Sequence, residues 1–204
     1  MIDIDDVMRK LCDAGARAMG RYAEVSGEGP GDMPEYFMPA FILGQIGDEI
    51  SVTLETGFSK LVEWNDDTRK RRDLPARSPE EQAKLLALAD ELGTPRVDMV
   101  LFAGQDQGVP KDEQDFLALV EFKRYSASPD DRAKLLRILP HIDTCLYGVV
   151  CGNIEDRHLQ SHRAEAEKLG DRWYQSVLPG DFRWFFCARL FAASPLPGSS
   201  QENR

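Results

Sequence analysis

The chain has 204 residues, of which 42% are apolar and 29% are charged, a balance typical of one globular domain with a sizeable core. No run of 18 apolar residues occurs, so we expect no membrane-spanning helix and no membrane partner. The acidic first residues lack the apolar segment of a secretory signal. The formal net charge is −10, which excludes general attraction to nucleic acid, because proteins bind its backbone through Lys and Arg. A nucleic acid ligand would therefore need a local basic patch or a partner subunit.

The cysteines indicate a reducing environment. None of the four stands in a CxxC pair, and all lie in apolar surroundings: Cys12, Cys145, Cys151 and Cys187. We therefore predict reduced, buried, structural thiols and a cytoplasmic protein.

Two helices are predicted in the first quarter of the chain. Apolar residues recur at helical spacing over 3–24, and a Gly-rich connector follows. A second helix is predicted over 32–47, with Asp32 as its N-cap and Glu35 at the capping-box position. Pro39 should kink or delay this helix.

The first strand is predicted within 50–64, where β-branched and alternating residues are concentrated. It either continues past Gly57 into a second strand or bends there. Glu55 lies on the polar side of this strand, where it either joins a functional site or is merely solvated.

A basic loop and a helix are predicted next. The loop 65–77 has the densest positive charge of the chain, and its basic residues are Arg69, Lys70, Arg71, Arg72 and Arg77. It either contacts phosphate as a mobile loop or is a solvated loop neutralised by neighbouring aspartates. The helix 78–92 has Ser78 as N-cap and Glu81 in a capping box.

The central segment 95–125 reads as a β-hairpin with a long loop, because two apolar runs flank about eleven loop residues. Asp98, Glu121 and Lys123 interrupt these runs. Burying an unpaired carboxylate costs several kcal/mol, so a compensating group, such as a divalent metal, is expected. Side chains two apart share a face of a strand, so Glu121 and Lys123 point the same way, and pairing places Asp98 opposite about residue 120 or 121.

The last third of the chain is predicted to form a helix, a strand, a second helix and a second strand. A helix begins at Ser128, and the apolar strand 145–153 follows by a crossover that favours parallel pairing. A polar helix is predicted over 155–176. Its His158 and His162 have the spacing of a shared metal site, or they lie on an exposed helix face. The aromatic segment 181–191 predicts a strand whose rings pack or stack on bases, and we expect disorder over 194–204.

The hairpin resembles the core of the PD-(D/E)XK nuclease superfamily. The resemblance rests on Val97-Asp98-Met99 and Val120-Glu121-Phe122-Lys123, and it covers about residues 30–155. No proline directly precedes Asp98, since Pro95 stands three residues earlier. The resemblance implies an α/β fold with a restriction-endonuclease-like αβββαβ core. That core has a mixed central sheet flanked by helices, in one domain over 1–193 with extra elements at both ends. The predicted helix 78–92 departs from the simplest members.

The resemblance also implies a site. Asp98 and Glu121, with the carbonyl of Phe122, would bind Mg²⁺ or Mn²⁺, and Lys123 would orient or activate water and stabilise developing charge. Glu35 would be a third acid, with Glu49 as a rival, and Glu55 a further ligand. The same family pattern places a supporting basic residue at Arg132 or Lys134. Contacts to nucleic acid are assigned to Arg69, Lys70, Arg71, Arg72 and Arg124.

Three hypotheses for the function follow. The first is a metal-dependent nuclease that hydrolyses phosphodiester bonds, in DNA rather than RNA. The second is a catalytically inactive nuclease-fold module that binds a protein partner, which the net charge favours. The third is a nuclease subunit of a larger restriction or defence assembly, or a homodimer. A surface hairpin with a simple Glu–Lys pair is the plainest alternative interpretation of the motif.

Overall fold

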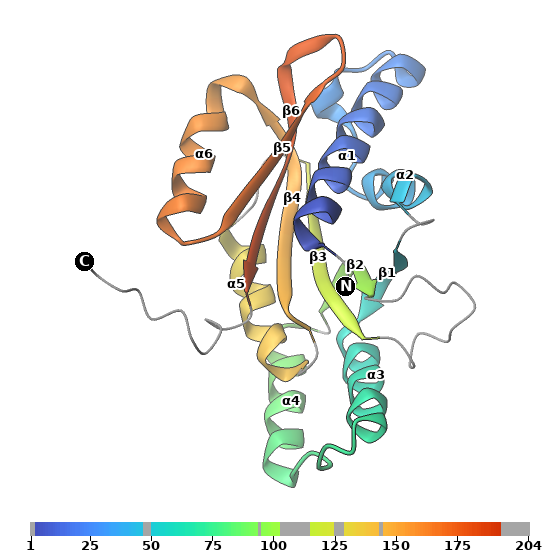
Figure 1. Cartoon of the computed structure of the whole chain (residues 1–204), viewed down its shortest axis with the longest axis vertical. Coiled ribbons are helices and arrows are strands. Elements are labelled where there is room, and N and C mark those ends of the chain that lie inside the picture. Colours follow the sequence, from blue (N-terminus) through green and yellow to red (C-terminus); the bar gives the residue numbers. More distant parts are fainter. Residues whose placement is uncertain are drawn as a thin grey trace.

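The protein is an α/β structure with one mixed six-stranded sheet and helices on both faces (Figure 1). The computed structural model describes residues 3–46, 50–93, 95–102, 115–124, 129–142 and 145–192. The strands are β1 (Ser51–Gly57), β2 (Arg96–Phe102), β3 (Phe116–Lys123), β4 (Tyr147–Glu155), β5 (Arg172–Leu178) and β6 (Asp181–Ala192). The helices are α1 (Ile4–Ser26), α2 (Phe37–Ile46), α3 (Phe58–Arg71), α4 (Pro79–Glu91), α5 (Pro129–Ile138) and α6 (Asp156–Lys168), with short 3-10 turns at Pro30–Asp32 and Leu139–His141. The sheet order is β1-β2-β3-β4-β6-β5.

The predicted first helix is confirmed as α1, and the start of the second is corrected. Asp32 belongs to a 3-10 turn and caps no α-helix, because α2 begins at Phe37. With this start Pro39 falls in the first turn, where its missing N–H breaks no hydrogen bond. Glu35 therefore lies before the helix and is free to reach across the molecule.

The region after the first strand was predicted wrongly. β1 ends at Gly57, and the chain turns at once into α3 instead of a second strand and a basic loop. The helix buries Phe58, Leu61 and Thr68, which share one helical face. Arg69, Lys70 and Arg71 form the last turn of α3 and Arg72 is its C-cap, so their positive charges interact favourably with the helix dipole. Arg77 lies beyond the helix, buried and paired with Asp66 at 2.6 Å.

The predicted capping box of α4 is confirmed. The Ser78 hydroxyl accepts a hydrogen bond from the Glu81 N–H, and the Glu81 carboxylate accepts one from the Ser78 N–H. Helices α3 and α4 lie together at one end of the molecule in Figure 1.

The central hairpin and the parallel strand after it are both confirmed. β2 and β3 are antiparallel with Met99 paired to Val120, so Asp98 stands opposite Glu121, as expected. β3 and β4 are parallel, and Lys123 pairs with Gly152. The C-terminal end of β3, the start of β2 and the end of β1 therefore meet at one edge of the sheet.

The predicted helix 155–176 is too long. α6 ends at Lys168, and the left-handed conformation of Gly170, with a φ of 74°, turns the chain out of the helix before β5. β6 forms as predicted and pairs with both β4 and β5. Phe186 packs in the core beneath α1, and Phe185 packs on the other face beside α6.

Two apolar cores lie on the two faces of the sheet. One joins α1 and α2 to β2, β3, β4 and β6, and the other joins α3, α4 and α5 to the opposite face. The four cysteines are free and buried, as predicted. None of the described helices is long and apolar enough to cross a membrane. The tail predicted to be disordered, 194–204, lies outside the described residues.

Candidate functional site

The strand register brings two acids together on the face of the sheet that α5 covers. Asp98 on β2 and Glu121 on β3 are cross-strand neighbours, and the charge of Asp98 raises the pKa of Glu121. Lys123 follows two residues along the same face. These three side chains share one face of the sheet, near enough for the charge of Asp98 to act on the pKa values of both Glu121 and Lys123.

Asp98 is held by the backbone of the neighbouring strand. Its Oδ2 accepts a hydrogen bond of 2.7 Å from the N–H of Phe122. Burial raises the pKa of Asp98, although this hydrogen bond and the charges of Lys134 and Lys123 act to lower it. The carboxylate is therefore fixed in position but incompletely compensated.

Glu121 is the most buried acid of the site, with 2% of its surface exposed. Burial first, and the charge of Asp98 second, raise the pKa of Glu121 to about 7. The ammonium of Lys134, from α5, lies 2.7 Å from Glu121 Oε1 as an ion pair. The geometry at Glu121 Oε1 is not that of a hydrogen bond, so the contact is an ion pair only. The ammonium of Lys134 donates its hydrogen bond to the Arg96 carbonyl, at 2.7 Å. Of the two supporting residues expected on this helix, Lys134 reaches the site, whereas Arg132 pairs with Asp171.

Lys123 lies between two further acids. Its Nζ is 3.5 Å from Glu35 Oε2 and 3.6 Å from Asp131 Oδ1. Burial acts to lower the pKa of Lys123, but the charges of Asp131, Glu35 and Asp98 together raise it. The side chain is thus a fixed positive charge near neutral pH and is not a base.

Asp131 is the residue that sequence reasoning missed. It stands in the first turn of α5, on the side of the helix that faces Lys123. Its Oδ2 is buried without a hydrogen-bond partner among the described residues, and burial raises its pKa. The available signal was its i, i+3 spacing to Lys134, which places both on the helix face toward the sheet.

Glu35 and Glu55 approach the site from other elements. Glu35 accepts a hydrogen bond of 3.1 Å from the Arg124 N–H, which ties the segment before α2 to the end of β3. Glu55 is exposed, has a positive φ of 52°, and lies near enough for its charge to raise the pKa of Asp98. Glu49 lies outside the described residues.

The residues predicted to contact nucleic acid separate into two places. Arg124 directly follows β3 beside the site, where it binds Asp32 and the Gly31 carbonyl. Arg72, by contrast, pairs with Asp115 at the other end of β3, and the rest of the basic run precedes it on α3. The structure does not bring the basic run to Lys123.

The acids fit a cation held partly by water and substrate. Within the described residues, no three His, Cys, Asp or Glu side chains form a complete metal cage. Mg²⁺ commonly takes one or two carboxylates, with waters and a substrate phosphate as its remaining ligands. Asp98 and Glu121 meet that smaller requirement, and the Oδ2 of Asp131 adds a buried oxygen that has no hydrogen-bond partner among the described residues.

Comparison with protein-family models, with curated proteins and with solved structures finds no match for this chain. The functional argument therefore rests on the geometry of the chain itself.

Proposed function

We propose that the protein is a metal-dependent nuclease that hydrolyses phosphodiester bonds, with DNA as the favoured substrate. One observation carries the proposal: Asp98, Glu121 and Lys123, from two strands, gather on one face at the edge of the sheet, with the acids only partly neutralised. The order α2, β1, β2, β3, α5, β4 supports it too, because it follows the αβββαβ order of PD-(D/E)XK nucleases once α1 is taken as an extra N-terminal element and α3 and α4 as an insertion.

The acids would bind the metal ion, and the lysine would act on the water and the phosphate. Asp98, Glu121 and the Phe122 carbonyl would hold Mg²⁺ or Mn²⁺, which supplies a more acidic water and offsets charge on the scissile phosphate. Hydrolysis adds the water oxygen to phosphorus, breaks the bond to the leaving ester oxygen and passes a proton to that oxygen. Lys123, being protonated, would orient the water and stabilise the charge that develops on the phosphate.

A cleavage assay with lysine variants tests this role. Lys123→Ala should retain the fold and lose at least about a hundredfold in the rate of DNA cleavage with Mn²⁺, since a lost charge-stabilising group costs that much. Lys84→Ala, which removes an exposed lysine of α4, is the matched control and should cleave as the parent does. Equal cleavage by the parent and Lys123→Ala would refute the assignment.

A second candidate is a catalytically inactive module of the same fold that binds a protein partner. It is favoured by the two lysines within the cluster, because Lys134 and Lys123 already offset part of its acidity. A net charge of −10 points the same way. Titration with Mn²⁺ in a calorimeter separates the two: the nuclease proposal requires binding that Asp98→Asn abolishes, whereas the module should show no heat at millimolar Mn²⁺. A nuclease subunit whose partner holds the DNA would bind Mn²⁺ but cleave only in the assembly.

A further inference from the structure

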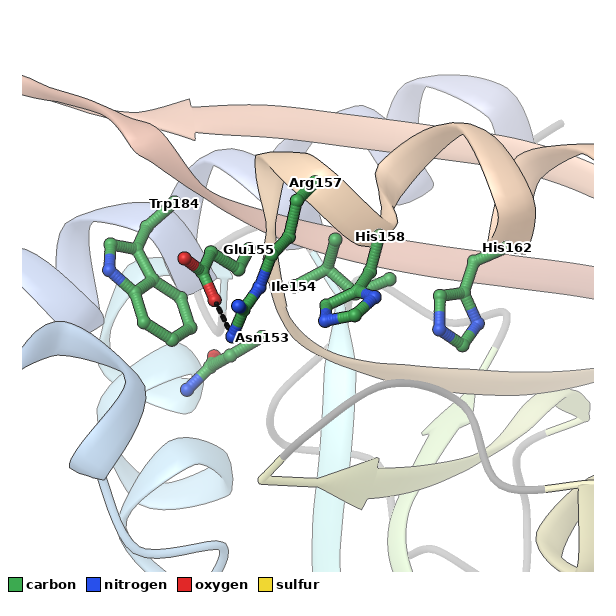
Figure 2. Close-up of a pocket in the computed structure, with 7 residues that line it drawn as sticks. All are labelled: Asn153, Ile154, Glu155, Arg157, His158, His162 and Trp184. Carbon is green, nitrogen blue, oxygen red and sulfur yellow. Dashed lines mark ion pairs between the residues drawn. The ribbon is translucent and has the colours of Figure 1, made fainter.

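A pocket opens where β4 ends and α6 begins. Its volume is about 340 Å³, within the range of small-molecule sites. The lining residues are Asn153, Ile154, Glu155, Arg157, His158, His162 and Trp184. Figure 2 shows Trp184, Glu155, Arg157 and Asn153 gathered at one end, and His158 and His162 projecting together from α6 at the other. None of these residues belongs to the candidate metal site.

The pocket lies directly beside that site. Gly152 pairs with Lys123 across parallel strands, which are about 4.8 Å apart, so Asn153 follows immediately next to Arg124. Both residues bind the turn before α2: Arg124 donates to the Gly31 carbonyl and Asn153 to the Pro30 carbonyl. Lys123 and Asn153 therefore lie at the same end of the sheet, on its two faces, and a strand that crosses this end can reach both.

The strongest sign of a ligand is the amide of Asn153. The residue is fully buried, with 0% exposed, yet its Oδ1 has no hydrogen-bond partner among the described residues. Its Nδ2 makes only a long bond of 3.5 Å. An unpaired buried acceptor costs about 1–3 kcal/mol, so a ligand that donates an N–H here would remove that cost.

The remaining walls favour a flat, uncharged ligand. Trp184 offers an aromatic ring, on which nucleobases stack. Glu155 and Arg157 form an ion pair of 2.8 Å, so the charges at this end of the pocket offset each other. Asn is also the side chain that pairs with the N–H and ring nitrogen of adenine.

We propose that this pocket takes one nucleobase with an exocyclic amino group, from the strand whose phosphate lies at Lys123. The inference rests on the proposed nuclease function for its substrate and adds a position at which the base is read. A base inside a duplex is stacked and cannot enter, so the segment bound here is single-stranded or carries a base turned out of the helix. The pocket, at the end of β4, would thus select one base of the substrate, while the proposed cleavage takes place at Lys123 on the neighbouring strand β3.

A scan with abasic nucleotides tests the pocket separately from catalysis. The parent protein is mixed, in EDTA so that it cannot cleave, with a fluorescent single-stranded oligonucleotide in which one abasic nucleotide is moved along the sequence. Affinity should fall about tenfold at one position and remain nearly constant elsewhere, as expected for one stacked base. Adding Trp184→Leu should lower the affinity for the intact strand by a similar factor and remove the effect of that abasic position.

His158→Ala provides a second variant that does not disturb the core, because His158 is exposed on α6. It should reduce the abasic effect, whereas Arg163→Ala, an exposed change on the same helix outside the pocket, should leave it intact. Three results would each overturn the proposal. The oligonucleotide does not bind, or the abasic nucleotide lowers the affinity equally at every position, or the position-specific effect persists in both Trp184→Leu and His158→Ala. Cleavage by the parent is scored separately: a position-specific abasic effect without cleavage keeps the pocket and rejects the nuclease, and the reverse result keeps only the nuclease.

Discussion

The buried carboxyl of Glu121 makes the stability of the fold depend on pH. It lies near the end of a mostly apolar strand, beside Asp98 and against the ammonium of Lys134. Burial raises the pKa of Glu121 to about 7 from the ordinary value of 4.5. The folded protein therefore accepts a proton on Glu121 more readily than the unfolded chain does, and ionising this carboxyl weakens the fold.

The sign of the pH dependence follows from that difference. Between about pH 4.5 and pH 7 the folded state binds more protons than the unfolded state, so the free energy of unfolding falls as the pH rises through this window. The loss is complete above pH 7 and amounts to about 3 kcal/mol at most. Glu121→Gln cannot ionise, so urea unfolding of this variant should show a flatter pH dependence between pH 5 and pH 8 than the parent.

The control is Glu63→Gln, which alters an exposed acid of α3 and should keep the pH dependence of the parent. Parallel pH curves for the parent and Glu121→Gln would contradict the assignment of a raised pKa. Asp98 and Asp131, whose pKa values are raised in the same direction, leave a smaller residual slope in the variant.

The pairing of β3 with β4 holds the site at the scale of elements. Gly152 stands beside Lys123, and a Cβ at this position would lie 2.2 Å from the Lys123 carbonyl oxygen. Only glycine allows this approach of the two strands, because a backbone oxygen cannot move aside without shifting the strand that carries it.

Gly152→Ala should therefore part the strands and displace Lys123. We expect a loss of about 1–3 kcal/mol in the free energy of unfolding, typical of overpacking, together with a loss of cleavage under conditions where the variant remains folded. Gly57→Ala is the matched control, since no atom lies within 4 Å of its added Cβ and its φ of −68° suits alanine. A Gly152→Ala protein as stable as Gly57→Ala would show that the strands tolerate the added methyl.

The elements that the sequence predicted correctly are those with a strong local signal. Capping residues define α4, and long apolar runs define β2, β3, β4 and β6. The errors arise where one pattern suits two structures. The residues after Gly57 combine β-branched and aromatic types typical of strands, yet they place Phe58 and Leu61 at helical spacing, and packing against the sheet selects the helix. Gly170, whose φ of 74° favours glycine, is the stop signal after α6 that the helical pattern of 155–176 conceals.

The candidate site was predictable only in part, for the same reason. The two-residue period of a strand places Glu121 with Lys123, and the hairpin places Asp98 opposite them. Contacts of Lys123 with Glu35 and Asp131 join segments that are far apart in the chain, through a connection and a crossover whose paths no local pattern determines. The pocket at Asn153 depends on β6 crossing beside β4, a pairing that the sequence left open.

Charge is distributed unevenly over the whole molecule. The net charge is −10, yet Lys70, Arg71 and Arg72 lie together at the end of α3. Arg72 is held by Asp115, which directly precedes β3, whereas Lys123 is its last residue. At about 3.3 Å for each residue of a strand, the two ends are about 25 Å apart, so the basic turn is remote from the acids that would hold a metal.

This separation sets the length of nucleic acid that can reach both places. Base pairs rise about 3.4 Å each, so a duplex with one phosphate at the candidate metal site must extend about eight base pairs to reach the basic turn. We expect Lys70→Ala with Arg71→Ala to weaken binding of a 20-base-pair duplex in Mn²⁺ and to leave a six-base-pair duplex unaffected. Losing two phosphate contacts should make the slope of log K against log salt about 2 less steep for the long duplex, which fluorescence anisotropy at several salt concentrations measures.

The same two charges are removed elsewhere in the control, Arg9→Ala with Lys84→Ala, on exposed faces of α1 and α4. If both double variants weaken binding equally, the effect is that of net charge alone, and the basic turn has no special part in it. If only the Lys70→Ala, Arg71→Ala variant weakens binding, and only of the long duplex, the basic turn contacts nucleic acid at a place remote from the candidate metal site. The duplex length at which the two double variants begin to differ then measures the distance between the basic turn and the candidate metal site.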